Sequence, residues 1–334
     1  MILAVETSCD DTCAAVVADD GTLRSNVIAS QHAHDRFGGV VPEIAARHHL
    51  EVIDAVIARA LEEGGIGLDD VRLVAATRGP GLLGALLVGL SAAKGLAAAR
   101  ELPFAAVDHL QGHVAANFLA PDPCEPPFLC LIASGGHTLL ARVSDHERFE
   151  TLGSTLDDAA GEAVDKGARM LGLGYPGGPA LERLAAEGDP AAFAFPEVGR
   201  GGSARFAASL DFSFAGLKTA LLYRIRDLGE QVAQQRRADL AASFQAAVVE
   251  ALARRVEQGL RATGLQRLAI GGGVAANGPL RERLARIGVP LFVPSRALCT
   301  DNAGMIGSAA RFQTPMAYPD YLALDAFATG ERPQ

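Results

Sequence analysis

The sequence has no tryptophan, and its five cysteines form no CxxC pair. An odd number of cysteines without such spacing argues against a disulfide framework and against a thiolate zinc site. Long apolar runs are missing too, because the longest mildly apolar stretch, residues 79–93, is rich in glycine and stops at Lys94. A membrane span needs roughly 20 apolar residues, and Glu6 follows the first apolar residues with no basic leader before it. We therefore expect a cytoplasmic protein that does not enter a membrane.

Positive charge is scarce as well. The chain has 30 lysines and arginines against 39 aspartates and glutamates, so its formal net charge is −9. Nucleic-acid binding rests on basic surface, and composition alone therefore argues against an RNA partner. Most of the local basic clusters are expected to be solvated helix faces. These clusters are Arg200 with Arg205, residues 218–226, Arg236 with Arg237, and residues 254–267.

The length of the chain predicts two domains. Its 334 residues exceed the roughly 250–300 at which single hydrophobic cores stop growing. Apolar residues make up 49% and charged residues 21%, which is typical of a globular protein. The bulk composition says nothing about chemistry.

Two segments share a pattern of strand, short polar or glycine-rich bend, and returning strand. The first runs through residues 2–6, 7–12 and 14–17, and the second through residues 128–133, 134–137 and 138–143. This repetition predicts an internally duplicated α/β architecture.

Helices are predicted where apolar residues recur at helical spacing. Residues 43–63 place Ile53, Val56 and Ile57 on one face, and residues 238–263 form a longer amphipathic segment that Gly264 closes. A strand at 267–270 leads into three glycines and a helix at 279–287, with Asn277 placed to cap it.

His109 and His113 are four residues apart. If residues 108–118 are helical, both imidazoles leave the same face and can meet one metal ion, although such a pair alone is a weak signal. Leu110 stands where an HExxH zinc protease needs its glutamate, which argues against proteolysis. Asp301 is the leading third ligand, and its alternative role is to cap the following helix. Two histidines and a carboxylate suit Fe(II), with Zn²⁺ as the alternative.

Glycine-rich turns indicate a phosphate or nucleotide ligand. The Ser134, Gly135 and Gly136 turn leaves backbone N–H groups open to an anion, although such turns also occur for structural reasons. Neither this turn nor residues 271–273 match a Rossmann or P-loop pattern. In a helix covering residues 156–166, Asp158, Glu162 and Asp165 would share a face and present carboxylates to a cleft.

Nine segments together resemble the universal tRNA N6-adenosine threonylcarbamoyltransferase family, called TsaD in bacteria. They are ETSCDDT (6–12), VVPEIAARHH (40–49), RGPGLLGALLVGL (78–90), DHLQGH (108–113), ASGGHT (133–138), GEAVDKGARMLGLGYPGGP (161–179), DFSFAGLKTA (211–220), GGGVAAN (271–277) and TDNAGMIG (300–307). They follow the family's order over nearly the whole chain. Asp11 stands where the family usually has glutamate, Val164 where it has an aromatic residue, and Gly304 where it has alanine.

The resemblance implies the duplicated actin-like ATPase and sugar-kinase fold, with two lobes around a nucleotide-binding cleft. We expect residues 1–107 with 304–334 to form the first lobe and residues 108–303 the second. It also implies one divalent metal per subunit, Fe(II) first and Zn²⁺ second, on His109, His113 and Asp301. The substrate-binding positions that it implies are Ile132, Ala133, Ser134, Gly135, Gly136, Asp165, Gly178 and Asn277.

The implied reaction transfers the threonylcarbamoyl group from L-threonylcarbamoyladenylate to N6 of adenosine 37 in tRNAs that read codons starting with A, and releases AMP. Asp11 and Asp165 are the hypotheses for the proton acceptor. The implied partners are tRNA, a TsaB-type protein and a TsaE-type ATPase, which would supply the basic surface that this chain lacks. Two other functions stay open, namely a small-molecule kinase on the same fold and a non-catalytic nucleotide-binding scaffold.

Overall fold

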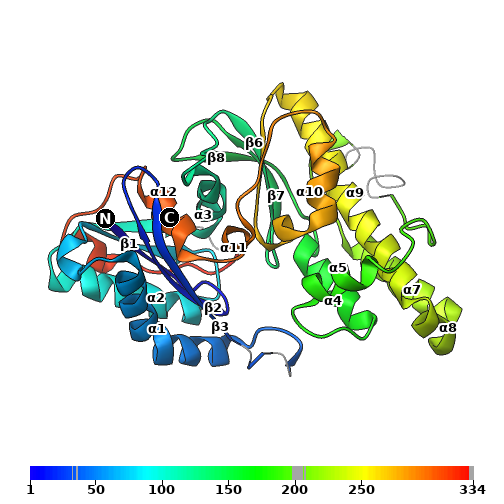
Figure 1. Ribbon diagram of the computed structural model, residues 1–334, viewed down its shortest axis with the longest axis horizontal. Helices are drawn as coiled ribbons and strands as arrows, with labels where there is room; N and C mark the ends of the chain where they lie inside the picture. Colours follow the sequence, from blue (N-terminus) through cyan, green and yellow to red (C-terminus); the bar gives the residue numbers. More distant parts are fainter. Residues whose placement is uncertain (32, 35–36, 198–205, 207, 331–334) are drawn as a thin grey trace. The chain divides into compact units, whose positions relative to one another are not determined.

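The computed structural model describes residues 1–31, 33–34, 37–197, 206 and 208–330. Arg200 and Arg205, one of the basic clusters, lie outside these residues. The chain divides into two compact units (Figure 1): the first is Met1–Pro126, Asp145–Arg148 and Ala297–Gln334, and the second is Pro127–Ser144 and Phe149–Arg296.

The first unit is built on a five-stranded sheet in the order β3-β2-β1-β4-β5. Its strands are β1 (Ile2–Glu6), β2 (Asp11–Val17), β3 (Leu23–Ser30), β4 (Leu73–Gly79) and β5 (Phe104–Asp108). β1 pairs antiparallel with β2 and parallel with β4, and β4 pairs parallel with β5. The helices of this unit are α1 (Pro42–Gly64), α2 (Leu83–Ala99), α3 (His109–Ala115) and α12 (Ala303–Ala310), while the short α11 (Arg296–Cys299) begins at the boundary between the units.

Both faces of this sheet are buried, which explains why β1 and β2 are almost continuously apolar. Leu3, Val5 and Val16 join Ile53 and Ile57 of α1 in one core. On the opposite face, Gly307 of α12 lies so close to Val17 and Ala4 that a Cβ there would approach Val17 Cγ2 to 2.6 Å. Figure 1 shows α1 and α2 on one side of the sheet and α12 on the other.

The second unit repeats the strand order of the first. Its order, given in the same direction as that of the first sheet, is β8-β7-β6-β9-β10. Its strands are β6 (Phe128–Ala133), β7 (Thr138–Val143), β8 (Phe149–Ser154), β9 (Leu268–Gly271) and β10 (Leu291–Phe292). β6 pairs antiparallel with β7 and parallel with β9, as β1 does with β2 and β4. The duplicated architecture predicted from the two hairpins is confirmed.

Helices of the second unit gather around the long α9, which packs against its sheet where Gly259 faces Leu140 and Leu129. They are α4 (Ala160–Met170), α5 (Gly177–Ala185), α7 (Ala215–Leu228), α8 (Glu230–Gln235), α9 (Arg237–Thr263) and α10 (Gly278–Ala285). Gly264 ends α9 in the left-handed conformation, and the Asn277 side chain caps α10 by accepting from Leu280 N, so both sequence-based helix signals are confirmed.

The expected lobe boundaries differ from these units at the segment around α3. The sequence put residues 108–303 together, whereas residues 108–126, 145–148 and 297–303 belong to the first unit. The physical reason is packing: α3 lies against α12, and the Ser308 hydroxyl donates to Ala115 O over 2.7 Å.

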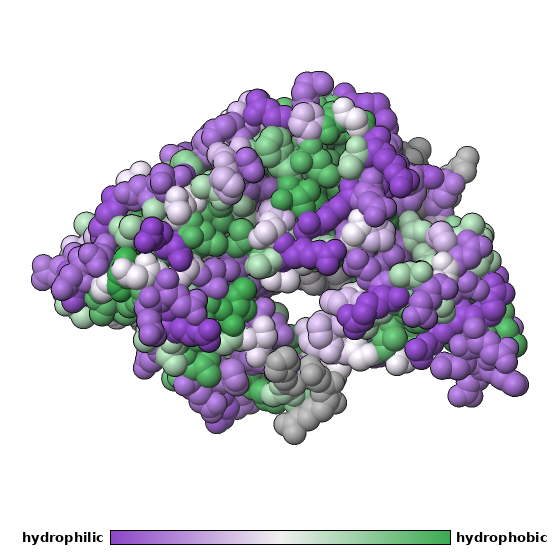
Figure 2. Space-filling view, in the orientation of Figure 1, coloured by the Kyte–Doolittle hydropathy of each residue, from purple (hydrophilic) through white to green (hydrophobic). Residues whose placement is uncertain are grey.

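Among the described residues, no helix combines the length and the apolar character needed to cross a membrane. Hydrophilic residues cover much of the face seen in Figure 2, with smaller hydrophobic groups between them.

Candidate functional site

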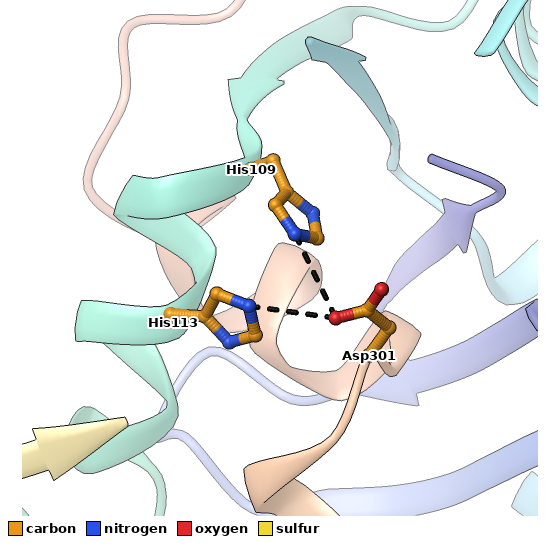
Figure 3. A group of neighbouring side chains, drawn as sticks. All are labelled: His109, His113 and Asp301. Carbon is orange, nitrogen blue, oxygen red and sulfur yellow. Dashed lines mark ion pairs between the residues drawn. The ribbon is translucent and has the colours of Figure 1, made fainter. Parts of the chain in front are cut away.

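Two imidazoles and one carboxylate meet in the first unit. β5 ends at Asp108, whose side chain caps α3 by accepting from Leu110 N and Gln111 N. The helix therefore starts at His109, and His113 follows one turn later on the same face. Both rings point toward Asp301 (Figure 3), with Nε2 of His109 3.6 Å and Nε2 of His113 3.4 Å from Asp301 Oδ1. The three ligand atoms lie within 4.8 Å of one another, as a shared cation requires.

Asp301 lies in the short connection between α11 and α12. The sequence left open whether this residue caps α12, but the cap is Asn302, whose side chain accepts from Met305 N over 2.9 Å. The backbone carbonyl of Asp301 accepts from the Cys13 thiol of β2. The Asp301 side chain is 23% exposed, so its carboxylate faces the histidines without serving as the helix cap.

The donor set fits a divalent metal on two observations. His113 is fully buried, and neither of its ring nitrogens has a hydrogen-bond partner among the described residues, a costly state for a buried polar group that a metal would relieve at Nε2. At His109, burial disfavours the charged ring, but Asp301 and Glu6 together outweigh it and raise the pKa to about 9. The pocket therefore attracts positive charge, and a metal would take the place of the proton.

Asp11, one of the two predicted proton acceptors, begins β2 in the same unit. Burial raises its pKa to about 6, with further increases from the nearby Asp301 and Asp10 carboxylates, against a hydrogen bond to Ser30 that lowers it. Its side chain is only partly buried. A carboxylate with such a pKa is suited to general-base work near neutral pH.

The predicted anion-binding turn lies in the second unit between β6 and β7. Ile132 and Ala133 are buried in β6, and the turn is closed by Ser134 N donating to His137 O over 2.8 Å. Gly135 and Gly136 are exposed, and a Cβ at either position would meet no atom within 4 Å. Packing within the chain therefore does not require these glycines, and the backbone here is open to a ligand.

The N-terminus of α4 reaches this turn, because Gly161 N donates to Ser134 O over 3.1 Å. A Cβ at Gly161 would lie 2.5 Å from Ser134 O, so only glycine permits this approach. On the other side, Gly272 has φ +87°, and a Cβ there would lie 2.4 Å from Ala133 O. A helix N-terminus beside exposed backbone N–H groups is suited to an anion.

The other three predicted substrate positions are also in the second unit. Asp165 Oδ1 accepts from Gly177 N at the start of α5, over 2.9 Å, and Gly178 follows in an open position. The Asn277 amide donates to Glu182 Oε2 and to Gln245 Oε1, both over 3.0 Å. Asn277 thus combines its helix cap with contacts to two neighbouring side chains.

The expectation that Asp158, Glu162 and Asp165 share a helix face is wrong for Asp158, because α4 begins at Ala160. Asp158 instead accepts from Lys166 Nζ over 2.8 Å and from Lys218 Nζ over 2.6 Å. Asp158 therefore precedes the helix and is held by two lysines.

Sequence reasoning gave no chemical role to Glu6, which contacts His109 Nδ1 over 3.0 Å. The signal available in the sequence was a single acid at the end of the apolar strand Ile2–Glu6. The structure adds that this side chain is completely buried.

The chain matches the family described as "TsaD: tRNA N6-adenosine threonylcarbamoyltransferase" over residues 22–308. Proteins named tRNA N6-adenosine threonylcarbamoyltransferase are similar to it along most of their length. One from Clostridium perfringens (strain 13 / Type A) is 49% identical over 318 residues, covering 94% of this chain and 92% of that protein. One from Clostridium botulinum (strain Hall / ATCC 3502 / NCTC 13319 / Type A) is 48% identical, covering 93% and 92%.

Solved structures show the same fold at low sequence identity. Component A of the Acidaminococcus fermentans (R)-2-hydroxyglutaryl-CoA dehydratase has a TM-score of 0.55 at 15% identity, covering 96% of this chain and 98% of that one. HypF of T. kodakarensis has a TM-score of 0.61 at 14% identity, covering 92% of this chain and 47% of that one. These neighbours, with the duplicated sheets, place the chain in the actin-like ATPase and sugar-kinase fold. The family match and the relatives' identity over nearly the whole chain lead to one conclusion: the protein belongs to the TsaD family of tRNA N6-adenosine threonylcarbamoyltransferases.

Proposed function

We propose that this chain transfers the threonylcarbamoyl group of L-threonylcarbamoyladenylate to N6 of adenosine 37 in tRNAs that read codons starting with A. The observation that carries the proposal is the grouping of His109, His113 and Asp301 in a chain of this family. The N6 nitrogen forms a bond to the carbamoyl carbon, the bond from that carbon to the phosphate oxygen breaks, and AMP leaves. One proton leaves the N6 amine.

In this proposal the first unit holds the metal on His109, His113 and Asp301. A divalent cation bound there supplies Lewis acidity and a fixed anchor for oxygen atoms of the threonylcarbamoyl group. Two neutral imidazole donors and one carboxylate suit Fe(II) first and Zn²⁺ second. Asp11, with its pKa raised to about 6, is our first candidate for the proton acceptor, and Asp165 is the second.

The second unit is proposed to bind the adenylate through the turn Ser134–Gly136 and the start of α4. Support comes from the exposed glycines, whose backbone N–H groups no Cβ shields, and from the helix N-terminus beside them. The same donors stabilise the phosphate as negative charge develops on the departing AMP. Asp165, Gly178 and Asn277 complete the proposed substrate positions, together with Ile132 and Ala133 of β6.

A small-molecule kinase on the same fold is the competing function. A full-length HypF structure described as phosphate- and nucleotide-bound has a TM-score of 0.57 over 93% of this chain, which supports a nucleotide-type ligand but does not separate the two functions. The His-His-Asp group favours the transferase, because kinases hold Mg²⁺ on carboxylates and phosphates and have no need of imidazole ligands.

We further propose that a TsaB-type protein and a TsaE-type ATPase assist the reaction. Three exposed leucines support a protein partner: Leu50 of α1 is 67% exposed, and Leu83 and Leu87 of α2 are 44% and 40% exposed. α1 and α2 pack together where a Cβ on Gly84 would be 3.5 Å from Ala46, one turn before Leu50. With a formal net charge of −9, the isolated chain is expected to bind tRNA weakly and in a salt-sensitive way.

The test is a reconstitution with tRNA, threonine, bicarbonate, ATP, an adenylate-forming enzyme and the two partner proteins, followed by mass analysis of the nucleosides. The wild type should yield threonylcarbamoyladenosine, and the double variant His109→Ala, His113→Ala should yield none. A complete mixture without modified adenosine would refute the transferase function, and phosphorylation of a small molecule by the same preparation would favour the kinase.

A further inference from the structure

Glu6 is a fully buried acid at the end of an apolar strand. Its side chain is 0% exposed, and the four residues before it in β1 are buried and apolar. Burying a carboxylate is costly unless its oxygens accept hydrogen bonds. Both Glu6 oxygens do so: Oε1 accepts from Ser8 N, and Oε2 accepts from the Thr77 hydroxyl over 2.5 Å and contacts His109 Nδ1 over 3.0 Å.

The order of the strands explains why these groups meet. β1, β4 and β5 are parallel neighbours, with Val5 opposite Ala76 and Thr77 opposite Val107. Glu6 therefore closes β1 beside Thr77, and His109 follows directly after β5. The carboxyl ends of three adjacent parallel strands thus place a hydroxyl, a carboxylate and an imidazole in contact.

The contact bears on which nitrogen of His109 can bind a metal. Glu6 Oε2 already accepts from the Thr77 hydroxyl, and a proton on His109 Nδ1 would be accepted by the same atom, which would leave the lone pair on Nε2. Nε2 is the atom that faces Asp301 Oδ1. The Ser8 hydroxyl, 3.2 Å from Nδ1, also lies at this nitrogen and not at Nε2.

We propose that Glu6 is a positioning residue for the metal, which fixes the tautomer and the ring orientation of His109, and that Thr77 in turn holds Glu6. The inference rests on the metal site of the proposed function. Carboxylate partners of metal-bound histidines raise metal affinity by about 10–100-fold through orientation and ligand basicity. The competing role is purely structural: Glu6 would serve only to close the turn at Ser8.

The first measurement is Zn²⁺ affinity of the purified, chelator-stripped full chain, by competition with a chromophoric chelator. Glu6→Gln should weaken Zn²⁺ binding about 10–100-fold, and Thr77→Val should weaken it less but in the same direction. Glu51→Gln changes an exposed acid on α1 of the same unit and should leave the affinity unchanged. Wild-type affinity in both Glu6→Gln and Thr77→Val would overturn the proposal.

The second measurement separates positioning from folding and needs no metal. Nitrogen-15 spectra of histidine-labelled, metal-free protein, recorded over a pH series up to the pH at which the His109 ring is neutral, report which ring nitrogen carries the proton. The wild type should show His109 protonated on Nδ1, and the two variants should show a mixture. If Glu6→Gln does not fold, Thr77→Val alone decides, and an unchanged tautomer there overturns the proposal. A wild type that takes up no Zn²⁺ would refute the proposed metal function, while the tautomer would still decide the role of Glu6.

Discussion

The two units have sheets of the same strand order but satisfy their carboxylates differently. In the first unit, Glu6 and Asp301 face the imidazoles of His109 and His113. In the second, Asp158 faces the ammonium groups of Lys166 and Lys218. The lysines supply fixed positive charge from within the chain, whereas an imidazole can give up its proton and bind a cation from outside.

The bends after the first strand of each sheet differ in the same sense. After β1, Ser8 N is engaged by Glu6, and a Cβ on the nearby Gly81 would lie 2.7 Å from Ser8 O, so this bend is closely packed. After β6, Gly135 and Gly136 face open space. One topology therefore carries a closely packed bend in the first unit and an open bend in the second. The fold alone does not predict which of the two bends is packed and which is open.

The largest effect is expected from Asp301→Ala, which removes the carboxylate from the cation site. Zn²⁺ affinity and threonylcarbamoyl transfer should both fall by about 100-fold or more, beyond what loss of an outer partner costs. Binding of a non-reactive adenylate analogue should be unchanged, because its proposed contacts lie in the second unit. Calorimetric titration with each ligand checks both parts, and a joint loss of analogue binding would end the division of roles between the units.

Asp11→Asn tests whether the acid at the start of β2 accepts the proton. At saturating substrates the single-turnover rate should fall about 100-fold, the lower end for a general base. With a pKa of about 6, Asp11 is protonated below pH 6 and ionised above it, so the wild-type rate should rise through this pH. The variant should lose that inflection. If it persists in Asp11→Asn and disappears in Asp165→Asn, the base belongs to the second unit.

Gly135→Ala probes the open bend in the second unit. Its Cβ meets no atom of the chain within 4 Å, so the melting temperature should not change, while the methyl group blocks the approach of a phosphate to the backbone. We expect about tenfold weaker binding of the adenylate analogue, or roughly 1.4 kcal/mol. Gly161→Ala is the contrasting variant, because its Cβ would clash with Ser134 O and lower stability as well. Unchanged analogue binding by Gly135→Ala would contradict an anion site here.

Local patterns predicted the helices and hairpins because periodicity and turn chemistry are properties of neighbouring residues. α1, α9 and the Asn277 cap belong to this class. His109 and His113 were within reach for the same reason, since their spacing is one helical turn. Asp301, far away in the chain, was the leading third ligand with the helix cap as its alternative, and the structure shows that Asn302 takes the cap.

What sequence missed depends on which strands become neighbours. Glu6 meets Thr77 and His109 because β1, β4 and β5 lie side by side, and no local pattern encodes that order. The start of α4 was misplaced as well: Asp158 precedes the helix and pairs with Lys218 of a distant helix, a contact that no local pattern encodes. The expected lobes likewise missed that α3 packs on α12, a contact between segments far apart in the chain.

Asp158→Asn tests the internal neutralisation in the second unit and should have the smallest effect. Burial raises the pKa of Asp158, but the two lysines outweigh it and hold the pKa below its ordinary value. Its stabilising contribution is therefore present above pH 4 and is lost as the pH falls through the lower, folded-state value.

At pH 7 the Asp158→Asn variant should lose about 1–3 kcal/mol of unfolding free energy, and the difference from wild type should shrink at pH 3. Glu43→Gln, whose pair with Arg47 is 76% exposed on both sides, should change stability by less than about 0.5 kcal/mol. Urea unfolding of the three proteins at both pH values measures these differences. Equal stability of Asp158→Asn and wild type at pH 7 would mean that the lysines do not stabilise this carboxylate in the folded chain.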